Sequence, residues 1–343
     1  MRLISAALEN PVRVEAKNAT GVSQEIQHAR RSSRTGRQLS FPILCQVTIA
    51  SEHLATSGIE ERGAIYTRRE VVDLILDLAG YTIERPLHNF RLLEPSFGGG
   101  DFLLPAIERL IAVWKANPVD GKDAVTDLSE CVRAVELHHE TFVHTRKAVI
   151  DRLAAYGIEQ PAAVELADTW LIQGNFLLMD LPQLFDFVVG NPPYVRQEMI
   201  PDALLAEYRS RYTTVYDRAD LYIPFIESSL AKLREGGHLG FICADRWMKN
   251  RYGGPLRRLV AEQFHLKIYV DMFGTPAFHT DVIAYPAITI IAREKGDKGR
   301  QATRIAHRPE ITAPALSELG SQLTAAKAPN GNSLCLLYTS RCV

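Results

Sequence analysis

From residue 70 onward, hydrophobic residues recur with helical spacing in some segments and form short apolar runs in others. The apolar positions within 71–78 have the spacing of one helix face, and Gly80 then supplies a stop signal. Apolar runs bounded by turn residues predict strands. We expect strands at 91–94, 131–136, 170–173, 185–189, 238–243, 268–271 and 282–292, and further helices at 102–111, 139–155, 219–233 and 254–264.

Strands that alternate with helices favour an α/β fold in which helices cover both faces of a mostly parallel sheet. The last two expected strands have no helix between them, so they should pair antiparallel at one edge. The prediction is a Rossmann-like, seven-stranded sheet with an antiparallel edge hairpin. Segment 117–129 is polar and is expected to be a loop, and the polar, basic segment 293–310 a linker or surface loop. Residues 1–60 are weakly patterned, with a basic stretch at 28–37, and are expected to be a partly flexible N-terminal extension.

Composition narrows the class of protein. The 343 residues are 46% hydrophobic, and 39 Lys and Arg against 40 Asp and Glu give a net charge of −1. This balance excludes a polybasic protein but permits a local nucleic-acid patch. No apolar run reaches the roughly 18–20 residues of a membrane span, and the five cysteines are scattered without a CxxC pair. We therefore expect a reduced, cytoplasmic, soluble enzyme with no membrane contact and no metal site.

The first motif that carries chemistry is Glu94-Pro-Ser-Phe-Gly-Gly-Gly100, where an expected strand ends in an acid and a glycine turn leads into a helix capped by Asp101. The spacing is not GxGxxG, and Glu94 would repel a pyrophosphate. A cationic ligand with a carboxylate tail, such as S-adenosylmethionine, suits the motif better, although a purely structural turn fits equally well. Glu136 ends the next strand, where a carboxylate can accept two ribose hydroxyl hydrogen bonds.

The second motif is Asn191-Pro-Pro-Tyr194, directly after an apolar strand. The two prolines restrict the backbone, so that the Asn191 side-chain oxygen and the Pro192 carbonyl can be held at one point as two acceptors. Two acceptors aimed at the amino group of an aromatic base, or at an amide nitrogen, free the nitrogen lone pair to attack a methyl group. Tyr194 offers a flat surface for a planar substrate. A rigid polar turn is the structural alternative.

These motifs resemble N6-adenine-specific DNA methyltransferases of restriction–modification systems, with the cofactor motif first and a target-recognition domain last. The resemblance runs from about Gly63 to Ala292. It implies a class I methyltransferase fold, S-adenosylmethionine as methyl donor, and transfer to the N6 amino group of a flipped-out adenine in a specific sequence of double-stranded DNA. It also admits a restriction endonuclease as partner or fusion, and it indicates no oligomeric state.

The resemblance assigns roles to individual residues. Thr67 matches the residue that contacts the cofactor's methionine carboxylate, and Phe278 falls where an aromatic packs on the extruded base with Tyr194. Asn175 stands where the family usually has an Asp that holds the cofactor's adenine amino group, and Phe176 is expected on the adenine ring or in the core. The resulting cofactor set is Thr67, Glu94, Pro95, Gly98, Gly100, Glu136, Asn175 and Phe176, and the catalytic set is Asn191, Pro192, Pro193 and Tyr194.

Segment 245–258 holds five basic residues against the single acid Asp245. It is expected to be either a phosphate-facing patch or a solvated helix face. The basic residues are Arg246, Lys249, Arg251, Arg257 and Arg258.

We expect a catalytic domain at 61–295, followed at 296–343 by a linker or the start of a truncated target-recognition domain. About 50 residues are fewer than such a domain usually has, so we expect cofactor binding without robust sequence-specific methylation. Residues 335–343 lack periodicity and an evident partner strand, and they match the translation of two inverted transposase-adaptor ends used in sequencing libraries. We expect them to be a non-native tail.

Two other interpretations remain open from the sequence. An NPPY motif also serves methyltransferases that act on RNA bases or on protein glutamine, because an amide nitrogen and an aromatic amine pose the same chemical problem. Alternatively, the chain is a non-catalytic fragment that binds cofactor or DNA.

Overall fold

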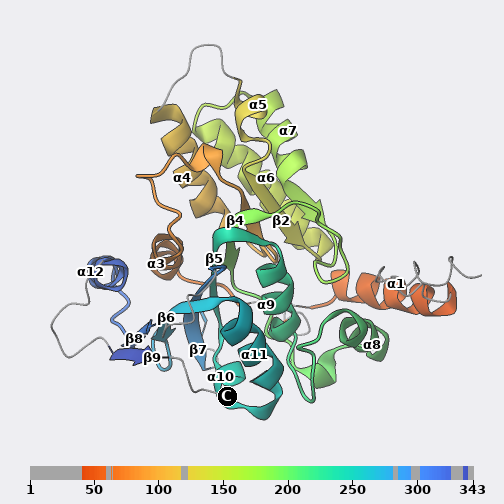
Figure 1. Cartoon of the computed structure of the whole chain (residues 1–343). Helices are drawn as coiled ribbons and strands as arrows, with labels where there is room; N and C mark the ends of the chain where they lie inside the picture. The colour runs from red at the N-terminus through yellow and green to blue at the C-terminus, as the bar shows by residue number, and fades with distance from the viewer. Residues whose placement is uncertain are drawn as a thin grey trace, which may run out of the picture. The chain divides into compact units, whose positions relative to one another are not determined.

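The computed structural model describes residues 41–58, 63, 65–116, 123–280, 285–294, 302–325 and 335–338. Within these ranges nine strands form one sheet in the order β3-β2-β1-β4-β5-β7-β6-β8-β9 (Figure 1). The strands are β1 (Leu92–Glu94), β2 (Val132–Glu136), β3 (Leu171–Gln173), β4 (Phe185–Gly190), β5 (Leu233–Ala244), β6 (His265–Asp271), β7 (Pro286–Ala292), β8 (Ala302–His307) and β9 (Cys335–Tyr338).

Helices connect most of these strands. They are α1 (Phe41–Ala55), α3 (Arg69–Ala79), α4 (Leu103–Ala116), α5 (Ala124–Leu128), α6 (His139–Ala155), α7 (Gln160–Trp170), α8 (Asp202–Arg211), α9 (Tyr222–Ala231), α10 (Arg246–Lys249), α11 (Gly254–Gln263) and α12 (Ala313–Thr324). None of the described helices is long and apolar enough to cross a membrane.

Each face of the sheet carries its own hydrophobic core, because successive side chains of a strand point to opposite faces. Leu92 and Val189 pack into one core with the buried faces of α3, α4, α6, α7 and α12. Leu93 and Val188, their chain neighbours, pack into the other core with α8, α9 and α11. In Figure 1, α9 and α11 lie in front of the sheet. The α/β fold with helices on both faces, predicted from the alternating pattern, is confirmed.

Several elements match the sequence pattern closely. Helix α3 ends at Gly80, whose φ of 86° is a left-handed conformation that favours glycine. Helix α6 has the predicted bounds of 139 and 155. Strands β1, β2, β4 and β5 run parallel, and β7 lies antiparallel to both β5 and β6.

The predicted antiparallel pairing of the last two expected strands is confirmed, since β6 and β7 pair antiparallel. The predicted count of seven strands and the edge position of this pair are wrong. Strand β7 lies between β5 and β6 rather than at an edge, and β8 pairs parallel with β6. Part of the expected linker, 302–307, is therefore a strand; its exposed basic residues obscured the buried positions Thr303 and Ile305. Cys335–Tyr338 pairs antiparallel with β8, so this segment has the partner strand that the sequence did not reveal.

Helices α1, α5, α7, α8 and α12 occupy segments that the pattern did not assign to helices. Helix α5 lies in the expected loop 117–129, where Asp123 accepts a hydrogen bond from the Thr126 N–H as an N-cap. Helices α7 and α8 were not predicted, and Trp170 ends α7 instead of starting a strand. The basic stretch 28–37 and most of the expected N-terminal extension lie outside the described residues.

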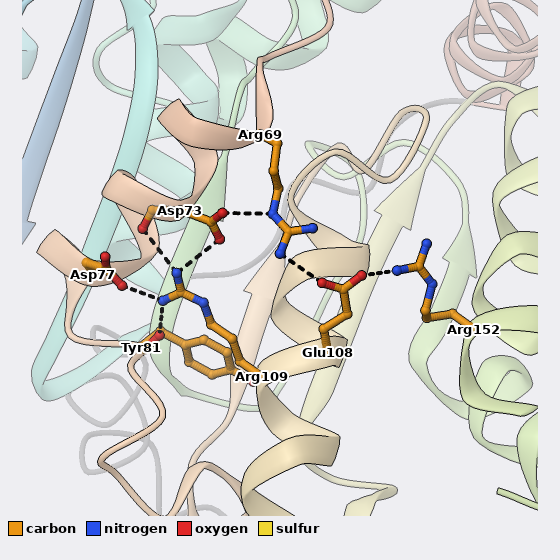
Figure 2. Close-up of polar contacts among 7 residues, drawn as sticks. All are labelled: Arg69, Asp73, Asp77, Tyr81, Glu108, Arg109 and Arg152. Carbon is orange, nitrogen blue, oxygen red and sulfur yellow. Dashed lines mark hydrogen bonds and ion pairs between the residues drawn. The ribbon is translucent and has the colours of Figure 1, made fainter. Parts of the chain in front are cut away.

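An ion-pair network joins α3, α4 and α6 (Figure 2). Arg109 is its centre, since one guanidinium donates to Asp73 at 3.0 Å and to Asp77 at 2.6 Å. Arg69 extends the network by donating to Asp73 and to Glu108, each at 2.8 Å. Helices α3, α4 and α6 begin at Arg69, Leu103 and His139, shortly after the predicted site residues Thr67, Gly100 and Glu136. The network therefore helps to fix the backbone that carries these residues. The labelled residues are Arg69, Asp73, Asp77, Tyr81, Glu108, Arg109 and Arg152.

Candidate active site

The NPPY motif begins at the carboxyl end of β4, where parallel sheets usually bind ligands. The Asn191 side-chain amide nitrogen donates to the Ile65 carbonyl at 2.9 Å and to the Thr67 hydroxyl oxygen at 3.2 Å. A backbone carbonyl can only accept, so the amide nitrogen must face Ile65 and the oxygen must face away. That oxygen, Asn191 Oδ1, is buried and has no hydrogen-bond partner among the described residues.

Gly63 holds Tyr194, the C-terminal residue of the NPPY motif, in place. Its carbonyl accepts a hydrogen bond from the Tyr194 N–H at 3.0 Å. Its φ is 60°, and a Cβ at this position would lie 2.5 Å from the Tyr194 carbonyl carbon. Both observations require glycine here. The role of Gly63 was not predicted, because its contact is made with a residue distant in the sequence.

The segment from Tyr66 to Arg68 also packs against the loop after β6. The Arg68 N–H donates to the Ala277 carbonyl at 3.0 Å, and Thr67 forms a β-bridge with Phe278. This contact brings Phe278 next to Tyr194, with ring centroids 6.3 Å apart and planes at 82°. The two expected base-contacting aromatics are therefore neighbours. Because the two rings meet edge to face, a flat base can stack between both ring faces only if one of the rings turns.

The glycine turn surrounds two buried acids. Glu94 is 1% exposed, and its Oε2 has no partner within the described part of the chain. Burial raises the pKa of this carboxyl well above its usual value, and the nearby carboxylates Asp101 and Glu136 raise it further. Gly98, with a φ of 48°, makes the left-handed turn.

Asp101 has a different role from the expected helix cap. Its Oδ2 accepts a hydrogen bond from the Thr67 N–H at 2.7 Å, across to the segment that holds Asn191. Burial raises the pKa of Asp101, and the Thr67 hydrogen bond partly offsets this. Gly100 has a φ of 88° and packs near Thr145 and Leu104. Its positive φ places it in the turn, and its contact with the cofactor stays a prediction.

Glu136 is only 7% exposed and binds two backbone amides. Its Oε2 accepts from the Gly98 N–H at 2.9 Å, and its Oε1 accepts from the His138 N–H at 2.8 Å. Each carboxylate oxygen keeps a second lone pair that can accept from a ligand hydroxyl. Glu136 therefore joins the glycine turn to the strand end while it faces the pockets described next.

Two adjoining pockets lie over these strand ends. An acidic pocket of about 580 Å³ is lined by Thr67, Glu94, Asp101 and Asn191, among others. An apolar pocket of about 650 Å³ is lined by residues that include Leu54, Pro95, Asn175, Phe176, Tyr208 and Phe225. Ser96, Glu136 and Pro193 line both pockets, so the two form a continuous site.

The apolar pocket contains a polar cluster that the sequence did not predict. The Asn175 amide nitrogen donates to the Tyr208 hydroxyl at 2.8 Å and to Ser51 Oγ at 3.3 Å. Asn175 Oδ1 accepts from the Leu177 N–H at 3.1 Å and keeps one lone pair. Phe176 packs against Phe225 with centroids 5.4 Å apart, so it belongs both to the core and to the pocket wall.

The expected basic patch at 245–258 is divided by its own contacts. Lys249 pairs with Asp245, and Arg258 lies 3.7 Å from Glu262. Arg257 donates to the backbone carbonyls of Trp247, in α10, and of Asn250, which follows α10. Much of the patch charge is therefore engaged within the protein, and Arg246 is the patch residue that lies against an exposed aromatic ring.

The sheet order and the two-pocket site at the ends of β1, β2, β3 and β4 define a class I S-adenosylmethionine-dependent methyltransferase fold. A protein from Listeria monocytogenes described as such a methyltransferase shares this fold, with a TM-score of 0.54 and 15% identity. The alignment covers 75% of this chain and 70% of that one.

Residues 130–278 match the Eco57I restriction-modification methylase family. It is similar to the Type II methyltransferase M.PaeR7I of Pseudomonas aeruginosa, 65% identical over 287 residues, or 83% of this chain and 49% of the relative. M.XhoI of Xanthomonas vasicola is 51% identical over 268 residues, or 78% and 49%. The chain thus spans about half the length of these relatives. The resemblance to restriction–modification methylases is confirmed, and S-adenosylmethionine is the methyl donor of this family.

Proposed function

We propose that the chain transfers a methyl group from S-adenosylmethionine to the N6 amino group of adenine in DNA. The observation that carries the proposal is the orientation of Asn191, whose Oδ1 is buried and lacks a described partner while its amide nitrogen is held by Ile65. A buried acceptor left without a donor costs about 1–3 kcal/mol. An incoming amino group would relieve that cost.

The proposed reaction depends on two acceptors at one point. Asn191 Oδ1 and the Pro192 carbonyl each accept one hydrogen bond from the amino group, and Asn191 Oδ1 has no partner among the described residues before the substrate binds. These contacts direct the nitrogen lone pair toward the methyl group, which S-adenosylmethionine supplies as an electrophile when bound. The acceptors are fixed before substrate arrives, so little reorganisation is needed in the transition state.

The two pockets fit the two ends of this cofactor. Glu94 lines the acidic pocket and carries an unpaired buried oxygen, which suits the cationic end. Phe176 and Phe225 in the apolar pocket suit the adenine ring, and Asn175 Oδ1 can accept from its amino group. Glu136 lies where the pockets meet, as a ribose contact requires.

Thr67 has two roles in this proposal. Its N–H is engaged by Asp101, and its hydroxyl oxygen accepts from Asn191. The hydroxyl hydrogen remains as a donor to the cofactor's carboxylate. Thr67 thereby connects the cofactor to the orientation of Asn191.

Access to N6 in a duplex requires that the adenine be rotated out of the stack, which costs a few kcal/mol. Tyr194 and Phe278 are the proposed stacking surfaces that offset part of this cost. Double-stranded DNA is the proposed substrate because the relatives are Type II methyltransferases and residues 130–278 match a restriction-modification methylase family. A restriction endonuclease is the proposed biological partner.

Methyl transfer from labelled cofactor to DNA, RNA and protein acceptors tests the proposal. We expect label in DNA, recovered as N6-methyladenine after digestion to nucleosides, although without robust sequence-specific methylation by this chain. Label in RNA or in protein glutamine, with none in DNA, would replace the proposal with the corresponding alternative. Label on cytosine would contradict the adenine assignment.

A further inference from the structure

Four exposed or half-exposed side chains form a row beyond the proposed active site, with an arginine at each end and two stacked aromatic rings between them. The Phe273 and Tyr285 rings stack with centroids 4.8 Å apart and planes at 11°. The Arg246 guanidinium lies over Tyr285 at 5.9 Å, and that of Arg308 lies over Phe273 at 5.0 Å. We call these four residues the Arg–aromatic row.

The sheet itself sets the order of the row. Its residues stand at the end of β5, the start of β7, the end of β6 and the end of β8, which are four neighbouring strands. The strand ends are paired in register, with Ala244 opposite Pro286 and Asp271 opposite both Ala287 and His307. Neighbouring strands lie about 4.8 Å apart, which matches the separation of the stacked rings. The row is therefore built into the carboxyl edge of the sheet.

The row is continuous with the proposed catalytic site. The loop after β6 carries both Phe273 and Phe278, and Phe278 contacts Tyr194. Strand β5, next to Arg246, is the direct neighbour of β4, from which Asn191 emerges. A substrate held at Asn191 that extends along this edge reaches the row.

Two features of the Arg–aromatic row are energetically unfavourable in the free protein, and a bound ligand would explain both. Phe273 and Tyr285 are 38% and 45% exposed, although stacked aromatic rings are usually buried. Arg308 has a φ of 47°, a left-handed conformation that is uncommon for arginine. Its N–H donates to the Asp271 carbonyl at 2.7 Å, which fixes the turn that places its side chain over Phe273.

The charge of the row remains available to a ligand. Arg308 Nε lies 3.6 Å from Asp271, which also faces His307 at 3.7 Å, so this contact leaves the two terminal amino groups of Arg308. Arg246 interacts electrostatically with Asp220, while the adjacent Asp245 pairs with Lys249. A guanidinium that lies on an aromatic ring keeps its N–H edge free, and that edge matches phosphate geometry.

We propose that the Arg–aromatic row binds the sugar–phosphate backbone of the DNA that flanks the target base. Arg246 and Arg308 donate to phosphate oxygens, and the Phe273–Tyr285 stack holds the two guanidiniums at a fixed spacing. This inference rests on the proposed DNA methyltransferase function and specifies where the duplex lies on the protein.

Binding of a fluorescein-labelled DNA duplex by the full chain, measured by anisotropy over a salt series, tests the proposal. The double variant Arg246→Gln with Arg308→Gln should reduce the slope of log K against log salt by about 2 and weaken binding about tenfold at low salt. Phe273→Ala should weaken binding severalfold, whereas Phe273→Tyr, which preserves the stack, should not.

The matched control is Arg91→Gln with Arg234→Gln. These half-exposed arginines stand at the start of β1 and β5, at the opposite edge of the sheet, and their removal changes the net charge equally. Equal loss in the control, an unchanged slope in the row variant, or no DNA binding by the unaltered chain at low salt would overturn the proposal.

The methyl-transfer assay separates this inference from the proposed function. If the unaltered chain methylates DNA and the row variants bind DNA as tightly as it does, the proposed DNA binding by the row is wrong while the proposed function stands. If the unaltered chain transfers no methyl group to DNA but the row variants lose DNA affinity, DNA binding by the row is supported and the proposed methyl transfer to DNA is contradicted.

Discussion

At the scale of single residues, Glu94 is the most unusual group of the site. It is buried, it lacks a described partner for one oxygen, and its pKa is raised mainly by desolvation. In the unfolded chain this carboxyl ionises at its usual, lower pKa. The folded protein therefore binds the proton more tightly, and the cofactor-free protein loses stability as pH rises through the interval between the two pKa values.

A bound cation should reverse that loss. We predict that thermal stabilisation by S-adenosylmethionine increases from acidic to alkaline pH, because binding to the ionised Glu94 releases a proton. In Glu94→Gln the cofactor-free protein should be more stable at alkaline pH, and cofactor affinity should fall about tenfold, or about 1.4 kcal/mol. Thermal unfolding with and without cofactor measures both. Glu262→Gln, an exposed change, is the control; identical pH dependence in the Glu94 and Glu262 variants would contradict the assignment.

Tyr208 carries a second prediction at this scale. Its hydroxyl accepts from the Asn175 amide nitrogen, which leaves Asn175 Oδ1 oriented for the cofactor. Tyr208→Phe should raise the cofactor Kd severalfold, equivalent to about 1 kcal/mol, with little change in kcat at saturation. Tyr212→Phe, which removes a hydrogen bond to the Leu177 carbonyl, is the matched control. Equal effects of the two variants on Kd would show that Tyr208 has no special role.

At the scale of elements, the sequence predicts best where burial is one-sided and regular. Helix α3 was found because its apolar face is continuous and Gly80 ends it. Strand β8 was missed because Arg304 and its neighbours make the segment polar overall, although alternate positions are buried. Helix α8 was missed because a segment of mixed polarity hides the apolar set Leu204, Leu205 and Tyr208. Weak amphipathicity, rather than absence of structure, explains these errors.

The ion-pair network between helices provides a prediction at this scale. Arg109 is 14% exposed and donates to Asp73, Asp77 and the Tyr81 carbonyl, as Figure 2 shows. Arg109→Ala should lower the free energy of unfolding by about 2 kcal/mol, because four acceptor atoms on three residues lose their donor. Urea denaturation measures the change. The exposed pair of Arg146 with Asp168 offers the comparison: Arg146→Ala should cost less than about 1 kcal/mol, and equal losses would contradict a central role for Arg109.

At the scale of the whole molecule, the site could be predicted as far as motifs at strand ends identify it. The acid at the end of β1, Glu136 at the end of β2 and the NPPY motif after β4 necessarily share one edge of a parallel sheet. The contacts of Asn191 with Ile65 and of Asn175 with Tyr208 and Ser51 could not be predicted, because they join segments 33 to 126 residues apart. The domain boundaries at 61 and 295 stay predictions, although the sheet continues through β8 and β9.

In the proposed mechanism Asn191 activates the acceptor nitrogen and does not hold the cofactor. Asn191→Ala should therefore be compared with the unaltered chain in two assays on the same preparations: cofactor affinity and transfer of labelled methyl groups to DNA. We predict a cofactor Kd within about twofold of the unaltered chain and a loss of transfer of about 10²–10³-fold or more. Equal loss in both assays, or transfer that persists in the variant, would contradict this role of Asn191.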